Sequence, residues 1–111
     1  MTAAHVKRPG EPTTEDCPMR AAMGAIGGKW SLILLYWLET PRRFNELLRL
    51  VPDISHKVLT EVLRTLEDEG LIVRIACETH VEYAISAHGR TARPLIDAIH
   101  DWGVAHLERP R

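Results

Sequence analysis

The stretch from Ser55 to Glu69 constrains the fold most, because both of its ends carry the signals of a helix. Ser55 is a favoured N-cap residue, and the next residue after the stretch, Gly70, suits the left-handed position that ends many helices. Apolar residues recur along one side at helical spacing: Val58, Leu59, Val62, Leu63 and Leu66. The other side is polar and carries His56, Lys57, Thr60, Glu61 and Arg64. The sequence therefore predicts a helix that packs on a core with one side and offers the other to a polar partner.

Three shorter helices are predicted before this one. The first starts at Pro18, a favoured first-turn residue, and ends before Gly27. Residues 30–38 are nearly all apolar, so a helix there must be covered on most sides and should form the centre of the core. Residues 44–50 form a third helix, which Pro52 closes.

A β-hairpin and a last helical stretch are predicted after it. Leu71 to Cys77 is rich in β-branched residues and His80 to Ile85 alternates, so these segments should pair, with the tip of the hairpin at residues 78–79. Ser86 can cap the final helical stretch. Pro94 lacks an amide proton and should kink or divide that stretch.

Length and composition limit the class of protein. A chain of 111 residues fits one domain, which we expect over residues 17–108, after a mobile N-terminal arm at residues 1–16 that has almost nothing to bury. The formal net charge of −1 argues against nonspecific coating of nucleic acid but allows a local basic face. The longest apolar run, residues 32–38, is far short of the roughly 20 residues that span a bilayer. Without a signal-like stretch either, we expect a cytoplasmic protein with no membrane partner.

The order of the elements predicts the fold class. A helix ending in a turn, a second amphipathic helix with a polar outer face, and then a hairpin is the order of a winged helix-turn-helix. We therefore expect an α+β protein, mainly helical, with a two-stranded β-hairpin wing. A helix of this kind fits the major groove of double-stranded DNA. The alternative is a protein-interaction module whose Ser55 to Glu69 face docks on another protein.

A series of short motifs adds a resemblance to a known family. They are Cys17-Pro18, Ile26-Gly27-Gly28-Lys29-Trp30, Arg43-Phe44-Asn45-Glu46-Leu47, Ile54-Ser55, Lys57-Val58-Leu59-Thr60, Leu63-Arg64-Thr65-Leu66-Glu67, Gly70-Leu71-Ile72, Val81-Glu82-Tyr83 and Trp102-Gly103. Together they resemble the HxlR-type, MarR-like family of bacterial transcription regulators, from Cys17 to about Leu107. This sequence departs from the family in two places: the hairpin is shorter than usual and lacks the customary proline, and His56 stands where Gln is common.

The resemblance implies a homodimeric regulator that binds an inverted-repeat operator near a promoter, and we expect a repressor. It also implies a dimer interface built from the first and last helices. The candidate interface residues are Met19, Met23, Leu95, Ile99 and Trp102. For the methionines, core packing is the alternative to a place in the interface, and a ligand site comes second to both.

The candidate DNA contacts are polar residues of the two central helices and the hairpin: Arg42, Arg43, Ser55, His56, Lys57, Thr60, Arg64 and His80. A solvated helix face is the alternative for the residues after Ser55. Arg42 and Arg43 are either phosphate clamps or partners of Glu46 in a surface salt bridge. His80 either reaches a phosphate or is an exposed turn residue.

Cys17 is the candidate redox-sensing residue. It stands at the start of a predicted helix, where the dipole favours thiolate, whereas Cys77 lies beside Glu78, whose charge opposes it. Asp16 works against thiolate formation at Cys17. Some members of the family that this chain resembles sense electrophiles or oxidants through a cysteine near the N-terminus. The alternative is a small apolar residue packed in the interface.

Nothing in the sequence predicts an enzyme, a cofactor or a metal site. The chain has no phosphate-binding loop, nucleophile elbow or zinc-protease motif. Cys77, Glu78 and His80 are close in sequence, but a strand and turn of this kind seldom holds a metal and no paired C-x-x-C is present. The tryptophans Trp30, Trp37 and Trp102 could line an effector pocket, although core packing is favoured for the first two. The sequence identifies no small-molecule effector.

Overall fold

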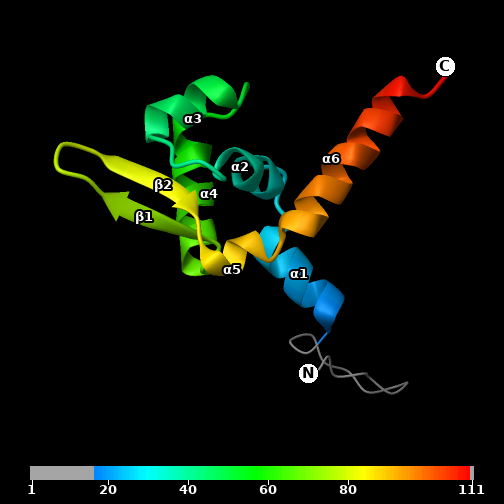
Figure 1. The fold of residues 1–111 in the computed structure, drawn as a ribbon, viewed down its shortest axis with the longest axis horizontal. Helices are drawn as coiled ribbons and strands as arrows, with labels where there is room; N and C mark the ends of the chain where they lie inside the picture. Colours follow the sequence, from blue (N-terminus) through cyan, green and yellow to red (C-terminus); the bar gives the residue numbers. More distant parts are fainter. Residues whose placement is uncertain (1–16, 111) are drawn as a thin grey trace.

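The computed structural model describes residues 17–110, and the arm predicted at residues 1–16 lies outside them. Six helices and two strands follow one another along this part of the chain (Figure 1). They are α1 (Pro18–Ile26), α2 (Ser31–Trp37), α3 (Phe44–Leu50), α4 (His56–Asp68), β1 (Ile72–Ala76), β2 (Val81–Ile85), α5 (Ala87–Arg90) and α6 (Arg93–Glu108). The predicted order of elements and the predicted α+β fold class are confirmed.

Helix α2 lies at the centre of the core. Figure 1 shows it between α3 and α4 on one side and α6 on the other. Its residues Leu34 and Leu35, together with Leu38 at its end, are fully buried, and Leu47 of α3 and Leu59 of α4 pack into the same cluster. Helices cover α2 on several sides, and this burial explains why the sequence of the segment is apolar along nearly its whole length.

Helix α4 begins and ends where its sequence predicted. The hydroxyl oxygen of Ser55 accepts a hydrogen bond from the amide of Val58 at 3.0 Å, which satisfies one of the unpaired amides of the first turn. Gly70 follows the helix with a φ of 76°, a left-handed conformation that costs little only for glycine. Leu59, Leu63 and Leu66 are buried, so the predicted apolar side faces the core.

Strands β1 and β2 form the predicted antiparallel hairpin. Ile72 pairs with Ile85 at its base, and the amide of Cys77 donates to the carbonyl oxygen of His80 at 2.8 Å at its tip. Residues 78–79 are thus a two-residue loop. On the edge of β2 that does not face β1, Tyr83 exchanges two backbone hydrogen bonds of 2.8 Å with Arg42. These bonds tie the hairpin to the segment between α2 and α3.

The last helical stretch is divided, as the position of Pro94 predicted. The hydroxyl of Ser86 caps α5 by accepting from the amide of Gly89 at 2.9 Å, and it donates to the carbonyl oxygen of Gly70 at 2.6 Å. The break falls just before Pro94, which occupies the first turn of α6, where a missing amide proton costs nothing. No helix within residues 17–110 has the length and apolar character needed to cross a lipid bilayer.

Candidate nucleic-acid interface

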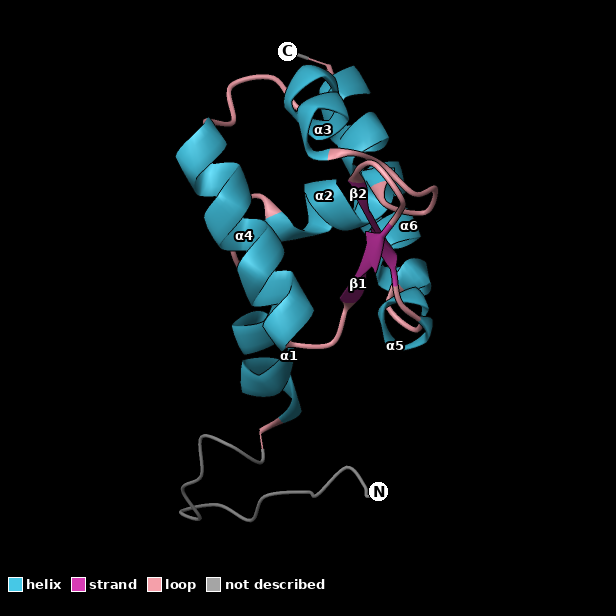
Figure 2. Ribbon diagram, turned by 90° about the vertical axis from the view of Figure 1, so that its left-hand side faces the viewer, coloured by secondary structure: helices cyan, strands magenta, loops and turns pink. Residues whose placement is uncertain are grey.

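The outward side of α4 carries polar side chains that another molecule can reach. Figure 2 shows this helix along one side of the molecule, next to the hairpin. The predicted contact residues of this segment are exposed, except for Thr60, which is half-buried: Ser55, His56, Lys57, Thr60 and Arg64. The structure therefore leaves the polar side of α4 available, as its sequence predicted.

One contact joins the first turn of α4 to α3, and a second lies within α4 itself. The ring of His56 packs against Phe44 of α3, with 4.5 Å between the ring centroids. The hydroxyl of Thr60 donates to the carbonyl oxygen of His56 at 2.9 Å, and its oxygen can still accept a hydrogen bond. The start of α4 is thus fixed against α3, while polar atoms remain accessible.

A hollow of about 430 Å³ separates α4 from the hairpin. Its lining residues are Phe44, His56, Thr60, Leu63, Arg64, Glu67, Arg74 and Tyr83. Three predicted contact residues meet there, whereas Ser55 and Lys57 lie outside the hollow. Arg74 was missed from the sequence, although it stands two positions after Ile72, and side chains two apart in a strand share a face. It adds an exposed basic side chain opposite α4.

The two arginines before α3 have different environments. Arg42 donates from Nε to the carbonyl oxygen of Trp37 and from Nη1 to the carboxylate of Glu46, each at 3.0 Å. Its side chain is 23% exposed and lies over the Trp37 ring. Arg42 therefore makes the salt bridge with Glu46 that the sequence offered as one of its two roles, and its contact with phosphate stays a prediction. Arg43 is exposed, and only its backbone amide contacts Glu46.

A second hollow, of about 470 Å³, shares Phe44 and Tyr83 with the first. Arg43, Arg49 and His80 also line it. The Nε2 atom of His80 lies 2.9 Å from the carboxylate of Glu82, and Nδ1 lies 3.2 Å from the hydroxyl of Thr79. The ring of His80 is thus engaged within the hairpin, and its contact with phosphate stays a prediction. Arg49, a further exposed cation on α3, was missed from the sequence.

The charges around these hollows are mixed. Glu61 and Glu67 accompany Lys57 and Arg64 on α4, so positive potential is confined to particular positions. The hydrogen bond from Arg42 lowers the pKa of Glu46 below its usual value, because it stabilises the carboxylate. Glu46 is therefore negative at neutral pH and neutralises Arg42, which leaves Arg43 as the available cation at the start of α3.

Exposed apolar side chains form a second group, on α1 and α6. In Figure 1, the hairpin lies on one side of the molecule, and α1 and α6 extend outward on the other side. The five predicted interface residues are all exposed, to between 40% and 70%: Met19, Met23, Leu95, Ile99 and Trp102. Ile96, in contrast, is buried against the core, so α6 has one anchored face and one open face.

Cys17 is the N-cap residue of α1, as its position before Pro18 predicted. Its side chain is half-buried and makes no capping hydrogen bond to the helix. Cys77, at the end of β1, is also a half-buried free thiol. Trp30 and Trp37 pack against the core cluster, whereas Trp102 is exposed and stacks on His106.

Comparison with known proteins agrees with this architecture. Residues 25–111 match the family model of the HxlR-like helix-turn-helix. YdeP of Bacillus subtilis, named as an HTH-type transcriptional regulator, is 41% identical over 99 residues, which are 86% of this chain and 77% of YdeP.

Two solved structures are also similar. The crystal structure of ytcD, described as an HTH-type transcriptional regulator, has 40% identity and a TM-score of 0.78 over 83% of this chain and 98% of ytcD. The redox regulator HypR in its oxidized form has 35% identity and a TM-score of 0.79 over 86% of this chain and 100% of HypR. The chain therefore belongs to the HxlR-like helix-turn-helix family: it is a DNA-binding transcriptional regulator with a winged-helix fold, and not an enzyme.

Proposed function

We propose that the protein binds an inverted-repeat operator as a homodimer, with one copy of α4 in each of two successive major grooves. The outward side of α4 is the observation that carries this proposal. Its N-terminal turns present exposed polar side chains, and the N-terminal residues of the second helix of a helix-turn-helix are those that reach base edges. Its other side is anchored in the core by Leu59, Leu63 and Leu66.

The side chains divide into two groups by their position. Lys57 and Arg64 are exposed cations on α4, suited to base edges or to the phosphates that border the groove. Ser55, His56 and Thr60 offer shorter hydrogen-bonding groups on the same helix. Arg43 and Arg74 flank α4 from the start of α3 and from the hairpin, so we assign them to phosphates.

Arg42 acts through its contacts with Trp37 and Glu46, as a positioning residue.

Selection of bound genomic fragments, followed by sequencing, would identify the operator. On that operator, Lys57→Ala and Arg64→Ala should each weaken binding, by about 1 to 3 kcal/mol where the contact is bidentate to a base. Arg90→Ala is the matched control, because Arg90 is also exposed but pairs with Glu39, away from α4. The assignment of this face is wrong if both α4 variants bind like the parent.

Salt dependence separates DNA binding from a protein-interaction module. Binding that uses phosphate contacts weakens linearly with the logarithm of salt concentration, because counterions are released. A protein that binds no duplex even at low salt would support the protein-interaction alternative instead.

The homodimer is supported by the apolar side chains on α1 and α6. Several large apolar side chains exposed on these helices are costly in water, and a two-fold axis would let the same residues cover one another. A dimer bound across a promoter would exclude RNA polymerase, so we propose that the protein is a repressor. We also propose that it acts in the cytoplasm, where the DNA is. A reporter gene behind the selected operator, with and without the protein, tests the sign of regulation.

We further propose that Cys17 responds to oxidants. Two observations support this: the structural similarity to the redox regulator HypR, and the position of Cys17 at the start of α1. Diamide treatment of the parent, Cys17→Ser and Cys77→Ser proteins, followed by operator binding and mass analysis, tests the proposal. The proposal fails if Cys17→Ser responds like the parent, or if modified Cys17 leaves DNA affinity unchanged.

A further inference from the structure

We propose that Cys77, His80 and Glu82 form a binding site for a divalent transition-metal ion of the zinc class at the tip of the hairpin. This goes beyond the proposed function, which does not require a metal. Within residues 17–110, these three residues are the one group of histidine, cysteine and carboxylate side chains placed closely enough to share an ion. Their ligand atoms all lie within 4.8 Å of one another.

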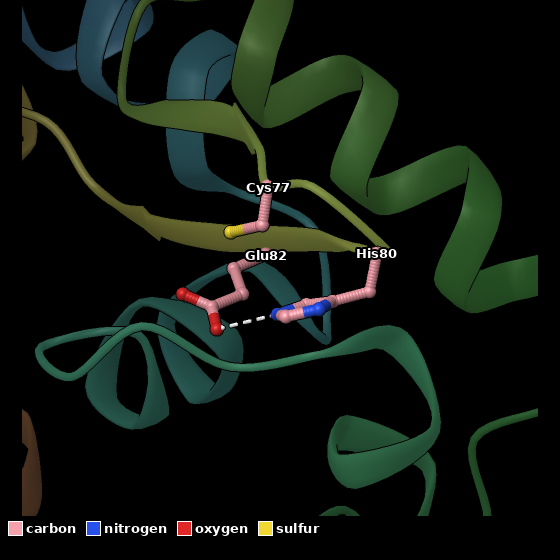
Figure 3. Close-up of side chains that lie close together, drawn as sticks. All are labelled: Cys77, His80 and Glu82. Carbon is pink, nitrogen blue, oxygen red and sulfur yellow. Dashed lines mark hydrogen bonds and ion pairs between the residues drawn. The ribbon is translucent and has the colours of Figure 1, made fainter.

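The register of the hairpin brings the three side chains together. Cys77 and His80 face each other across the two-residue loop, continuing the pairing of Ala76 with Val81. Glu82 lies two residues after His80, and side chains two apart in a strand point to the same face. Figure 3 shows the sulfur, the imidazole ring and the carboxylate gathered at this end of the hairpin, with a dashed line between His80 and Glu82.

The donor set matches the ligand preferences of zinc. A thiolate, an imidazole nitrogen and a carboxylate oxygen are its usual protein ligands, and in a tetrahedral site such atoms lie about 3.3 to 3.6 Å apart. Nε2 of His80 and the Glu82 carboxylate oxygen are now 2.9 Å apart, while the widest separation in the group is within 4.8 Å. Small side-chain rotations would therefore reach the required geometry without moving the backbone. Three protein ligands leave the fourth position open.

A neighbouring hydroxyl favours the tautomer of His80 that a metal ion requires. In the metal-bound form, Thr79 Oγ1, which lies 3.2 Å from Nδ1 of His80, can accept a hydrogen bond from Nδ1–H, while Nε2 gives up its proton and becomes the ligand atom on the side of Cys77 and Glu82. Metal-bound histidines commonly have their other ring nitrogen held in this way. All three ligand residues are half-buried, so the ion would be partly shielded from water.

The carboxylate of this site is Glu82, and not Glu78. The sequence grouped Cys77 with Glu78 and His80 because these residues are close along the chain, and it favoured no metal. Glu78 belongs to the loop, however, whereas Glu82 is brought to Cys77 by strand pairing. The ligand spacing is therefore set by the hairpin register and not by a linear motif.

Binding would change the charge of the hairpin tip. The ion displaces the thiol proton of Cys77 to solvent, so a thiolate, a carboxylate and a 2+ ion sum to zero, where the metal-free group carries −1 from Glu82. The hairpin would then repel phosphate less, and the open position could accept a phosphate oxygen. This consequence rests on the proposed DNA binding, whereas the metal site itself does not.

Metal titration of the reduced full-length protein, without a polyhistidine tag and without DNA, tests the site. We expect one Co²⁺ per chain with thiolate-to-metal charge-transfer absorption, and Zn²⁺ should displace it. Cys77→Ser should abolish that absorption, and Glu82→Gln should weaken binding by at least about tenfold. Circular dichroism checks that both variants are folded, and the DNA-free readout keeps this test separate from that of the operator.

Two matched controls make the result decisive. Cys17→Ser removes the other thiol, and Glu78→Gln removes the neighbouring carboxylate, and both should bind Co²⁺ like the parent. The proposal is overturned if the parent binds no stoichiometric Co²⁺ at micromolar concentration. It is equally overturned if the absorption is lost in Cys17→Ser or retained in Cys77→Ser.

Discussion

Arg42 and Glu46 form a 3.0 Å ion pair across the first turn of α3, and the same guanidinium also donates to the end of α2 through the carbonyl oxygen of Trp37. Arg42 therefore joins two helices of the core. Its neighbour Arg43 is exposed, and within residues 17–110 only its backbone amide, and not its side chain, contacts Glu46. Two adjacent arginines thus have separable roles, one in holding the fold and one in reaching outward.

This difference predicts opposite results for two alanine variants. Arg42→Ala should lower the melting temperature, because it removes the guanidinium that pairs with the Glu46 carboxylate and donates to the Trp37 carbonyl. Arg43→Ala should melt like the parent but bind the operator more weakly and with a shallower salt dependence, because one phosphate contact is lost. Thermal melts and operator titrations at several salt concentrations measure both. Equal melting temperatures for the two variants would contradict the positioning role of Arg42.

The ion pair also predicts a pH dependence. The hydrogen bond from Arg42 holds the pKa of Glu46 below its usual value of 4.5 in the folded protein. Because this pKa is lower in the folded protein than in the unfolded chain, the charged Glu46 carboxylate contributes fully to stability at a pH above the usual value. This contribution is lost as the pH falls through the pKa of the folded protein. Glu46→Gln should therefore be less stable than the parent at neutral pH and should approach it in acid. Urea unfolding of both proteins across this range is the measurement. A stability difference that persists unchanged in acid would show that the carboxylate charge is not its source.

Ser55 has a structural role and a proposed binding role, which two substitutions separate. Ser55→Ala removes the acceptor for the amide of Val58 and should cost about 1 kcal/mol of unfolding free energy. Ser55→Asp keeps a good cap, so it should be as stable as the parent, but it places a negative charge where phosphate is expected. Urea unfolding and operator binding should rank the variants differently. Strong operator binding by Ser55→Asp would remove the N-terminal turn of α4 from the proposed interface.

Trp102 is predicted to be a principal contact between protomers. Its side chain is 66% exposed on α6, and a large aromatic side chain in an interface buries much apolar area. Trp102→Ala should reduce the dimer fraction in sedimentation and should weaken operator binding with it, since two half-sites must be read together. Val73→Ala is the control, because Val73 is an exposed apolar residue of the hairpin. An unchanged dimer in the tryptophan variant, or a monomeric parent, would place the interface elsewhere or remove it.

The elements that the sequence predicted best are those defined by local signals. Ser55 and Gly70 mark the ends of α4 through bonds and backbone angles within a few residues, and Pro94 marks the start of α6 in the same way. The polar side of α4 followed from helical periodicity alone. These features depend on neighbours in sequence, so no tertiary information was needed to find them.

The features that were missed depend on pairing between distant residues. Arg74 and Glu82 acquire their places from the hairpin register, and a shift of one residue would turn each to the other face. Gly89 is similar: a β-carbon there would collide with the carbonyl oxygen of Leu71, 18 residues earlier in the chain. The choice between the two roles of Arg42 needed the carbonyl of Trp37, which only the folded structure supplies.

The single side-chain oxygen of Ser86 donates to the carbonyl oxygen of Gly70, just after α4, and accepts from the amide of Gly89 within α5. Only residues 91–92 separate α5 from α6. Ser86 thus links the segment that leaves the helix proposed to read DNA to α5, which leads directly into the helix proposed to join protomers. In a dimer, α6 would then act as a lever arm, and a change in its tilt would carry α4 with it. The separation of the two copies of α4, which must match one helical turn of about 34 Å on an operator, would be set by the angle at which the α6 helices cross.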